Sequence, residues 1–265
     1  MLSLFRNSNR LTLRHKTLRS LTSAGLFLVF LFLLLGGSSA DAFSPMIPEI
    51  LNYDLTWTGI KAGEASLAIR QNGDEIAIMS TARSVKWVSV FYTVNDIAES
   101  RLQKNQKTPG IGQPVNYRLN IREGKHRKDK EVIFDHAALK AIYVDHLENE
   151  RKEFEIPPFV LDPLSSFYFL RTQNLEVGKS VYVTIFDSKK IWNVEVQVLR
   201  KERVEVPAGE FNTIVVKPLM QSEGIFYRKG EIYIWLTDDE RRIPVLLKTK
   251  VKIGSVNALL VGGTY

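Results

Sequence analysis

The residues best suited to acid–base or metal chemistry are three histidines spaced ten residues apart, His126, His136 and His146. The second and third each follow an aspartate, and a carboxylate beside an imidazole can orient it for metal binding or proton transfer. Neighbouring residues on a strand point to opposite faces, however, so an adjacent Asp-His pair cannot easily converge on one atom. Each pair also lies where a strand pattern ends, which favours a turn role over a catalytic or metal-binding one.

Two other polar groups invite the same question. Ser165 and Ser166 follow Asp162-Pro163, where a hydroxyl ordinarily belongs to the start of a helix. The acidic run at 238–240 lacks the spacing of a calcium loop and is followed at once by two arginines, which favours a solvated hairpin tip. The chain also contains no nucleophile elbow, zincin helix, P-loop or dinucleotide fingerprint. We therefore predict no catalytic residue, no metal ligand and no cofactor.

A basic cluster at residues 125–130 has two interpretations. Its cations could contact anionic lipid headgroups, each worth roughly 1 kcal/mol near such a surface. Asp129 and Glu131 interrupt the cluster, which favours a solvated loop. The cluster comprises Lys125, Arg127, Lys128 and Lys130.

Aromatic residues provide the remaining functional signal. The strand pattern at 232–236 is apolar on both faces, so we expect this strand to be covered on both sides, as a helix packed inside a curved sheet would achieve. If the helix fills the interior, the aromatic residues are core; if it does not, they line an apolar pocket for an acyl chain or similar ligand. The candidate ligand-lining residues are Tyr53, Trp57, Trp87, Phe91, Phe167, Tyr168, Trp192 and Trp235.

The first 42 residues indicate where the protein works. Five basic residues precede an apolar block at 24–35, and Ala40-Asp41-Ala42 then places small residues before a cut after Ala42. This order is typical of a secretory signal peptide, and the block is shorter than the ~20 residues of a membrane-spanning helix. We expect cleavage after Ala42 and a periplasmic product with no transmembrane segment; a leader retained as an anchor is the alternative.

Composition narrows the function classes. Without residues 1–42 the chain has 31 basic and 28 acidic residues, so it lacks the concentrated charge of a nucleic-acid-binding protein. The chain has no cysteine, which excludes disulfides, thiolate nucleophiles and acylation at a lipoprotein cysteine.

Period-two alternation dominates the rest of the chain and predicts short antiparallel strands. Asp162 and Pro163 suit the N-cap and first position of a helix, and 85–92 suits a short helix or irregular cover. There is no strand–helix–strand rhythm, which excludes a Rossmann sheet or TIM barrel. We predict a mainly β domain over residues 43–265: a single antiparallel, strongly curved sheet or barrel with one or two short helices. The expected strands cover 51–58, 65–69, 76–83, 93–102, 117–122, 132–134, 139–143, 154–156, 181–186, 191–199, 204–206, 211–217, 232–236 and 245–253.

Several sequence blocks resemble a bacterial exported family classed as a domain of unknown function. The blocks are Tyr-Asp-Leu-Thr-Trp at 53–57, Asp-Pro-Leu-Ser at 162–165 and Thr-Asp-Asp-Glu-Arg-Arg-Ile-Pro at 237–244. The closing strand–acidic turn–Pro–strand unit is also loosely similar to periplasmic lipoprotein-carrier half-barrels. Such resemblances imply an exported β protein but no reaction.

These observations favour a non-enzymatic envelope protein that binds an apolar or lipid-like ligand inside a curved sheet. Two alternatives stay open. One is a hydrolase of envelope polymers, which requires His136, His146 and nearby carboxylates to converge in one cleft. The other is a scaffold that binds another envelope protein through an exposed strand edge.

Overall fold

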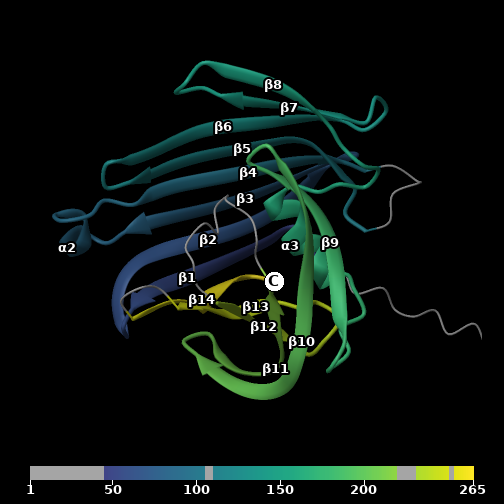
Figure 1. Cartoon of the computed structure of the whole chain (residues 1–265). Coiled ribbons are helices and arrows are strands. Elements are labelled where there is room, and N and C mark those ends of the chain that lie inside the picture. Colours follow the sequence, from purple (N-terminus) through teal and green to yellow (C-terminus); the bar gives the residue numbers. More distant parts are fainter. Residues whose placement is uncertain (1–44, 105–109, 220–230, 251–253) are drawn as a thin grey trace, which may run out of the picture. The chain divides into compact units, whose positions relative to one another are not determined.

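Hydrogen-bonded antiparallel strands make up most of the structure, as the alternating pattern predicts (Figure 1). The computed structural model describes residues 45–104, 110–219, 231–250 and 254–265. The expected leader and its cleavage after Ala42 lie outside these residues. The strands are β1 (Glu49–Trp57), β2 (Ile60–Asn72), β3 (Glu75–Ser84), β4 (Asn95–Gln103), β5 (Gln113–Glu123), β6 (His126–Asp135), β7 (Lys140–Asp145), β8 (Glu150–Glu155), β9 (Ser180–Asp187), β10 (Lys190–Val206), β11 (Gly209–Pro218), β12 (Ile232–Thr237), β13 (Pro244–Lys250) and β14 (Ser255–Thr264). The helices are α2 (Lys86–Ser89) and α3 (Pro163–Arg171).

All the strands of the described residues belong to one antiparallel sheet of order β8-β7-β6-β5-β4-β3-β2-β1-β14-β13-β12-β11-β10-β9. The chain builds one wing from β1 outward to β8, then begins again at the far edge with β9 and returns to β14. Strand β1 is therefore central, with β2 on one side and β14 on the other. The sheet is strongly curved and not closed (Figure 1), which confirms the predicted fold class.

Side chains bridge the gap between the two edge strands. Phe154 of β8 and Phe186 of β9 lie 5.5 Å apart between ring centroids. Leu161, just before α3, forms an isolated parallel bridge with β9, in which the Phe186 N–H donates to its carbonyl at 2.8 Å. Lys189, in the turn after β9, forms an ion pair with Glu150 at the start of β8. The edges are thus joined by packing and charge instead of a strand ladder.

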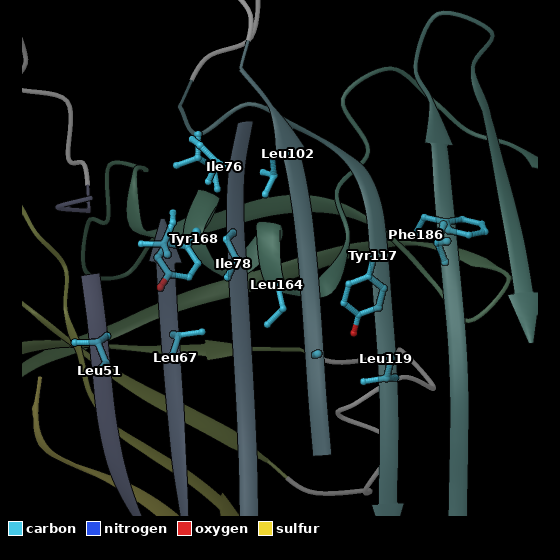
Figure 2. Packing of buried hydrophobic residues seen from close by; sticks show 14 of the residues in the cluster. Leu51, Leu67, Ile76, Ile78, Leu102, Tyr117, Leu119, Leu164, Tyr168 and Phe186 are labelled. Atoms are coloured by element: carbon cyan, nitrogen blue, oxygen red, sulfur yellow. The ribbon is translucent and has the colours of Figure 1, made fainter. Parts of the chain in front are cut away.

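Helix α3 packs against the inner face of the sheet, which we define as the face that carries Glu49, Leu51 and Tyr53 of β1. Figure 2 shows Leu164 and Tyr168 of α3 among the buried side chains of this face. The predicted helix after Asp162 is therefore confirmed, and it occupies the interior of the curve.

Both faces of β12 are buried, as the apolar pattern of 232–236 predicts. Ile232, Ile234 and Leu236 belong to a buried cluster, here called the inner cluster, that also contains Leu161, just before α3, and Leu170 of α3. Trp235 faces the other way, where the β10–β11 hairpin folds over it: its indole Nε1 donates to Glu202 at 2.5 Å. The turn of that hairpin is held by the Ala208 N–H, which donates to the Leu260 carbonyl at 3.0 Å. The helix and the hairpin each cover one face.

Two sequence expectations need revision. Strand β14 was not foreseen, although Val256, Ala258 and Leu260 alternate; its partner β1 lies at the other end of the chain, so local pattern does not reveal the pairing. The segments expected as separate strands at 191–199 and 204–206 form one long strand, β10, with a register shift between Val198 and Arg200 that lets it bend.

Candidate functional site

The N-terminus of α3 is fixed to the sheet by a buried carboxylate. Asp162 accepts hydrogen bonds from the Leu164 and Ser165 N–H groups at 2.8 and 3.0 Å, which satisfies donors that every helix start leaves open. Its other oxygen accepts from the Ser100 hydroxyl of β4 at 2.6 Å. Ser166 donates to the Pro163 carbonyl at 2.8 Å, so both serines of this turn have structural partners.

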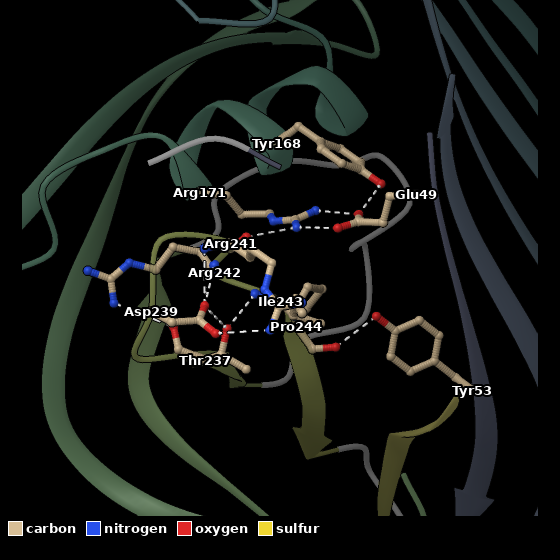
Figure 3. Close-up of polar contacts among 10 residues, drawn as sticks. All are labelled: Glu49, Tyr53, Tyr168, Arg171, Thr237, Asp239, Arg241, Arg242, Ile243 and Pro244. Carbon is tan, nitrogen blue, oxygen red and sulfur yellow. Dashed lines mark hydrogen bonds and ion pairs between the residues drawn. The ribbon is translucent and has the colours of Figure 1, made fainter. Parts of the chain in front are cut away.

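The C-terminal end of α3 is fixed by a buried ion pair with β1 (Figure 3). Arg171 Nη1 and Nη2 donate to the two Glu49 oxygens at 2.7 and 2.6 Å, and Tyr168 donates to the same carboxylate at 3.1 Å. Both side chains of the ion pair are fully buried. Burial alone would lower the pKa of Arg171, but the hydrogen bonds and charge of Glu49 outweigh it and raise that pKa.

The acidic turn between β12 and β13 also serves the fold. Asp239 Oδ1 accepts from the Thr237 hydroxyl at 2.6 Å and from two backbone N–H groups at 3.1 Å. The turn is joined to α3 because Arg171 donates to the Arg241 carbonyl at 3.0 Å, and to β1 because Tyr53 donates to the Pro244 carbonyl at 2.8 Å (Figure 3). Within the described residues no three His, Cys, Asp or Glu side chains gather as a metal site requires.

These contacts place α3 over one row of the inner face. Cross-strand pairing aligns Glu49 with Ile69, Ile78 and Ser100, and the helix bonds to the first and last of these four. A helix is about 10 Å across with its side chains, and successive inner-face residues of a strand lie about 7 Å apart. Helix α3 therefore covers this row and part of the next, while a row two steps along the strands lies beyond it.

Side chains become smaller on that uncovered part. The next row pairs Leu67 with Ser80 and Ala98, and the following row pairs Ala65 with Ala82 and Ala82 with the half-buried Asp96. Four of the apolar residues in this region are only half-buried, although they belong to the inner face. We call this region the alanine surface: Leu55, Ala65, Ala82, Ala98, Leu119 and Ile121 of β1–β5.

A buried hydroxyl lies beside the alanine surface. Tyr117 is 3% exposed, and its hydroxyl oxygen has no hydrogen-bond partner within the described residues. Burial, followed by the charges of Asp187 and Asp162, raises its pKa well above the ordinary value, so the phenol stays protonated. In Figure 2 the hydroxyl points along β5 toward Leu119.

The eight aromatic residues proposed from the sequence fall into separate places. Tyr53 and Tyr168 take part in the contacts that fix α3, and Phe167 is half-buried beside them, 6.2 Å from the Tyr168 ring. Trp192 of β10 packs half-buried against the inner cluster near the β9 edge. Trp235 lies on the opposite face, under the β10–β11 hairpin.

The other three lie at one end of β1–β4: Trp57 is the last residue of β1, Trp87 is in α2, and Phe91 is in the turn after α2. Their side chains are 45, 49 and 87% exposed. The structure therefore does not gather all eight residues in one lining; it divides them between the α3 contacts, two core faces and an exposed end of the sheet.

The histidines do not converge. His136 lies in the β6–β7 turn and His146 in the β7–β8 turn, at opposite ends of the ladder that joins β6 and β7. His136 Nε2 is 2.8 Å from the Pro114 carbonyl, and His146 Nε2 is 3.0 Å from Glu131. His126 is exposed at the start of β6. This arrangement does not provide the common cleft that the hydrolase alternative requires.

The basic cluster at 125–130 is divided between the two faces of the sheet, because alternate residues of β6 point to opposite faces. Lys130 points inward, 5.4 Å from the centroid of the buried Tyr143 ring and 4.0 Å from Asp145. Burial, followed by the charge of Lys128, lowers its pKa. Lys189 contacts the same ring at 4.8 Å. The sequence reasoning missed this pairing because the β9–β10 turn meets β7 only after the sheet has curved.

The outer face carries a groove of about 660 Å³ that is unlike a lipid site. Its walls include Asp54, Glu64 and Arg83, and Lys61 forms ion pairs with the first two at 2.7 and 2.8 Å. Within the described residues, no helix has the length and apolar character needed to cross a bilayer.

A curved antiparallel sheet that wraps a single helix defines a β-barrel-like protein. The chain belongs to the family described as a protein of unknown function (DUF3108), whose model matches residues 52–261. This finding agrees with the resemblance to a domain of unknown function. No curated protein matches the chain.

One solved structure shares the architecture at low identity, and another is less similar. A β-barrel-like protein of domain of unknown function DUF1849 from Brucella abortus is 12% identical, with a TM-score of 0.53, over 83% of this chain and 98% of its own. A hypothetical protein from Chlamydia trachomatis is 8% identical, with a TM-score of 0.39, over 85% of this chain and 90% of its own. The first likeness supports the fold alone.

Proposed function

We propose that this protein is an exported envelope protein that binds an apolar, lipid-like chain on the alanine surface. The observation that carries this proposal is the half-buried state of Leu55, Ala65, Ala82 and Ile121 on the inner face of the sheet, beyond the reach of α3. Inner-face residues of a curved sheet are normally covered by the core, and these are covered only in part.

The chemistry of the alanine surface suits an acyl chain. Burial of each methylene contributes about 0.8 kcal/mol, so a chain several carbons long would bind without any polar contact. Small side chains such as Ala65 and Ala82 let such a chain approach the strand backbone closely. The Tyr117 hydroxyl, at the α3 side of this surface, offers a donor to an oxygen of the ligand.

The fixed helix supports this function because a ligand site requires a stable wall. Asp162 and Arg171 tie the two ends of α3 to β4 and β1. The helix therefore forms one boundary of the alanine surface instead of spreading across it. The signal-peptide pattern of residues 1–42 supports export to the periplasm, where lipids in transit need carriers.

Neither alternative gains support from the geometry. The hydrolase requires a convergence of His136 and His146 that the structure does not provide. For the scaffold, the exposed edge strand β8 carries charged side chains at 150–153, a composition that resists pairing with another strand.

The test is to purify the protein gently from the envelope of cells that express the full chain, then to extract and identify bound lipid by mass spectrometry. We expect lipid in the wild-type protein and less in Ala82→Leu and Ala82→Phe, in order of added volume. Ala77→Phe is the matched control, since Ala77 is a half-buried alanine of the same strand on the outer face. Equal lipid in all four proteins, or none in the folded wild type, would overturn the proposal.

A further inference from the structure

Exposed apolar side chains gather at one end of the sheet. The β1–β2 turn and the loop that contains α2 both lie at the end of the strands where β1 and β3 finish. Phe91, Val90 and Ile60 are 87, 76 and 61% exposed, which are high values for large apolar side chains. We call this surface the aromatic rim: Trp57, Ile60, Trp87, Val90, Phe91 and Tyr92.

Specific contacts hold the aromatic rim in shape. Trp87 Nε1 of α2 donates to the Lys61 carbonyl of β2 at 3.2 Å, which joins the loop that contains α2 to the β1–β2 turn. Tyr92 lies against Gly124 in the β5–β6 turn; a Cβ on this glycine would come within 2.7 Å of the tyrosine ring. A prearranged surface loses little conformational entropy when it binds.

Basic side chains surround the aromatic rim. The three loop segments at 57–61, 85–94 and 122–128 contain six basic residues and one acidic residue, Glu123. Lys61 is neutralised by ion pairs with Asp54 and Glu64 on the outer face. Lys86 and Lys125 are exposed on either side of the rim. The surface that presents Phe91 and Val90 is therefore net positive.

We infer that the aromatic rim docks the protein onto a bilayer surface that contains anionic lipid. Aromatic rings favour the headgroup region of a bilayer, apolar side chains such as Phe91 gain by insertion below it, and nearby cations are attracted to the negative surface. A second copy of this chain is a poor occupant, because two net positive rims would face each other. The inference does not depend on a ligand on the alanine surface.

The test is co-sedimentation with vesicles of phosphatidylethanolamine and phosphatidylglycerol, using protein purified from the envelope of cells that express the full chain. Every variant has the same N-terminus, so differences between variants report on the rim. We expect Val90→Ser/Phe91→Ser to weaken binding about tenfold or more, since each side chain loses apolar burial. The matched control, Phe159→Ser/Val177→Ser, makes the same two substitutions at exposed positions outside the rim, 59 and 50% exposed, and should bind like the wild type.

The charge contribution is tested separately. We expect Lys86→Gln/Lys125→Gln to weaken binding to the anionic vesicles about fivefold per charge, and to leave binding to neutral phosphatidylcholine vesicles unchanged. Lys104→Gln/Lys179→Gln is the charge-matched control away from the rim. The inference would be overturned if the wild-type protein did not bind anionic vesicles, or if the rim variants bound them as well as the wild type does. So would a wild-type dimer that Val90→Ser/Phe91→Ser dissociates, since the rim would then be an interface between copies.

Discussion

Arg171 and Glu49 form a fully buried, two-pronged ion pair across 122 residues of sequence, and this pair decides where α3 lies on the sheet. Both guanidinium contacts are 2.7 Å or shorter, and Tyr168 adds a third donor to the same carboxylate. Because the two opposite charges lie at hydrogen-bond distance from each other, they tolerate burial, although Arg171 Nε has no hydrogen-bond partner within the described residues. The helix is thereby held over one row of the inner face, and Leu55, Ala65, Ala82 and Ile121 of the alanine surface are left half-buried.

Removal of one partner of this pair should destabilise the fold. We expect Arg171→Met to lower the free energy of unfolding by about 3–5 kcal/mol, because it leaves the Glu49 carboxylate buried without its counter-charge. Urea unfolding measures the change. Lys140→Met, which breaks the exposed ion pair with Glu153, is the control and should have no measurable effect. Equal stability of the two variants would contradict the assigned role of Arg171.

The cap of α3 should make stability depend on pH. Burial raises the pKa of the Asp162 carboxyl, and hydrogen bonds from Ser100 and Ser165 offset this only in part. The folded state then holds the proton more tightly than the unfolded state, so stability is lost as pH rises from the ordinary value through the folded pKa. Asp162→Asn cannot ionise, so its stability relative to wild type should increase with pH across that window. The opposite slope in pH-dependent unfolding would contradict this assignment.

The contact between the sheet edges should appear in the titration of Glu150. Hydrogen bonds from Lys152 and Lys189 lower its pKa to about 2. Its contribution to stability is present above its ordinary pKa and is lost as pH falls toward this value. In a carboxyl NMR titration, Lys189→Met should move the pKa of Glu150 upward while Lys152 retains part of the shift. An unchanged titration would show that the β9–β10 turn does not reach β8 in solution.

The buried hydroxyl of Tyr117 separates ligand binding from folding. In protein stripped of lipid, Tyr117→Phe should unfold at equal or higher denaturant concentration, because it removes a buried donor that lacks a partner within the described residues. If that hydroxyl donates to a ligand oxygen, the same variant should bind a fatty acid more weakly, as competition with a fluorescent fatty acid would measure. Tyr143→Phe, on the same inner-face row, is the control, since its hydroxyl donates to Asp145. Lower stability together with unchanged binding would contradict the role given to Tyr117.

Local sequence pattern predicted the sheet well because strand alternation and helix-start residues act over a few positions. Asp162 and Pro163 marked α3, and the two-faced pattern at 232–236 indicated a doubly covered strand. The pairing of β1 with β14 could not be read from such local signals, because it joins the two ends of the described chain.

The candidate site could be predicted from the sequence less well than the sheet, for a related reason. Aromatic type alone did not separate Tyr53, which fixes the helix, from Phe91, which is exposed. That distinction depends on which row α3 covers, and the row is set by Glu49, a charged residue at a strand start whose burial no local pattern signals. No sequence pattern distinguishes Ala65 and Ala82 from other alanines, because these small residues matter only through the volume that they leave free.

The most direct test of the alanine surface uses the methyl groups of five alanines in adjacent strands, Ala65, Ala68, Ala77, Ala82 and Ala98. A spin-labelled fatty acid should broaden the methyl signals of Ala65, Ala82 and Ala98, which face inward. The signals of Ala68 and Ala77, on the outer face of the same strands, should stay sharp. Equal broadening on both faces, or no broadening on either, would contradict a lipid-like ligand held against the inner face beside α3.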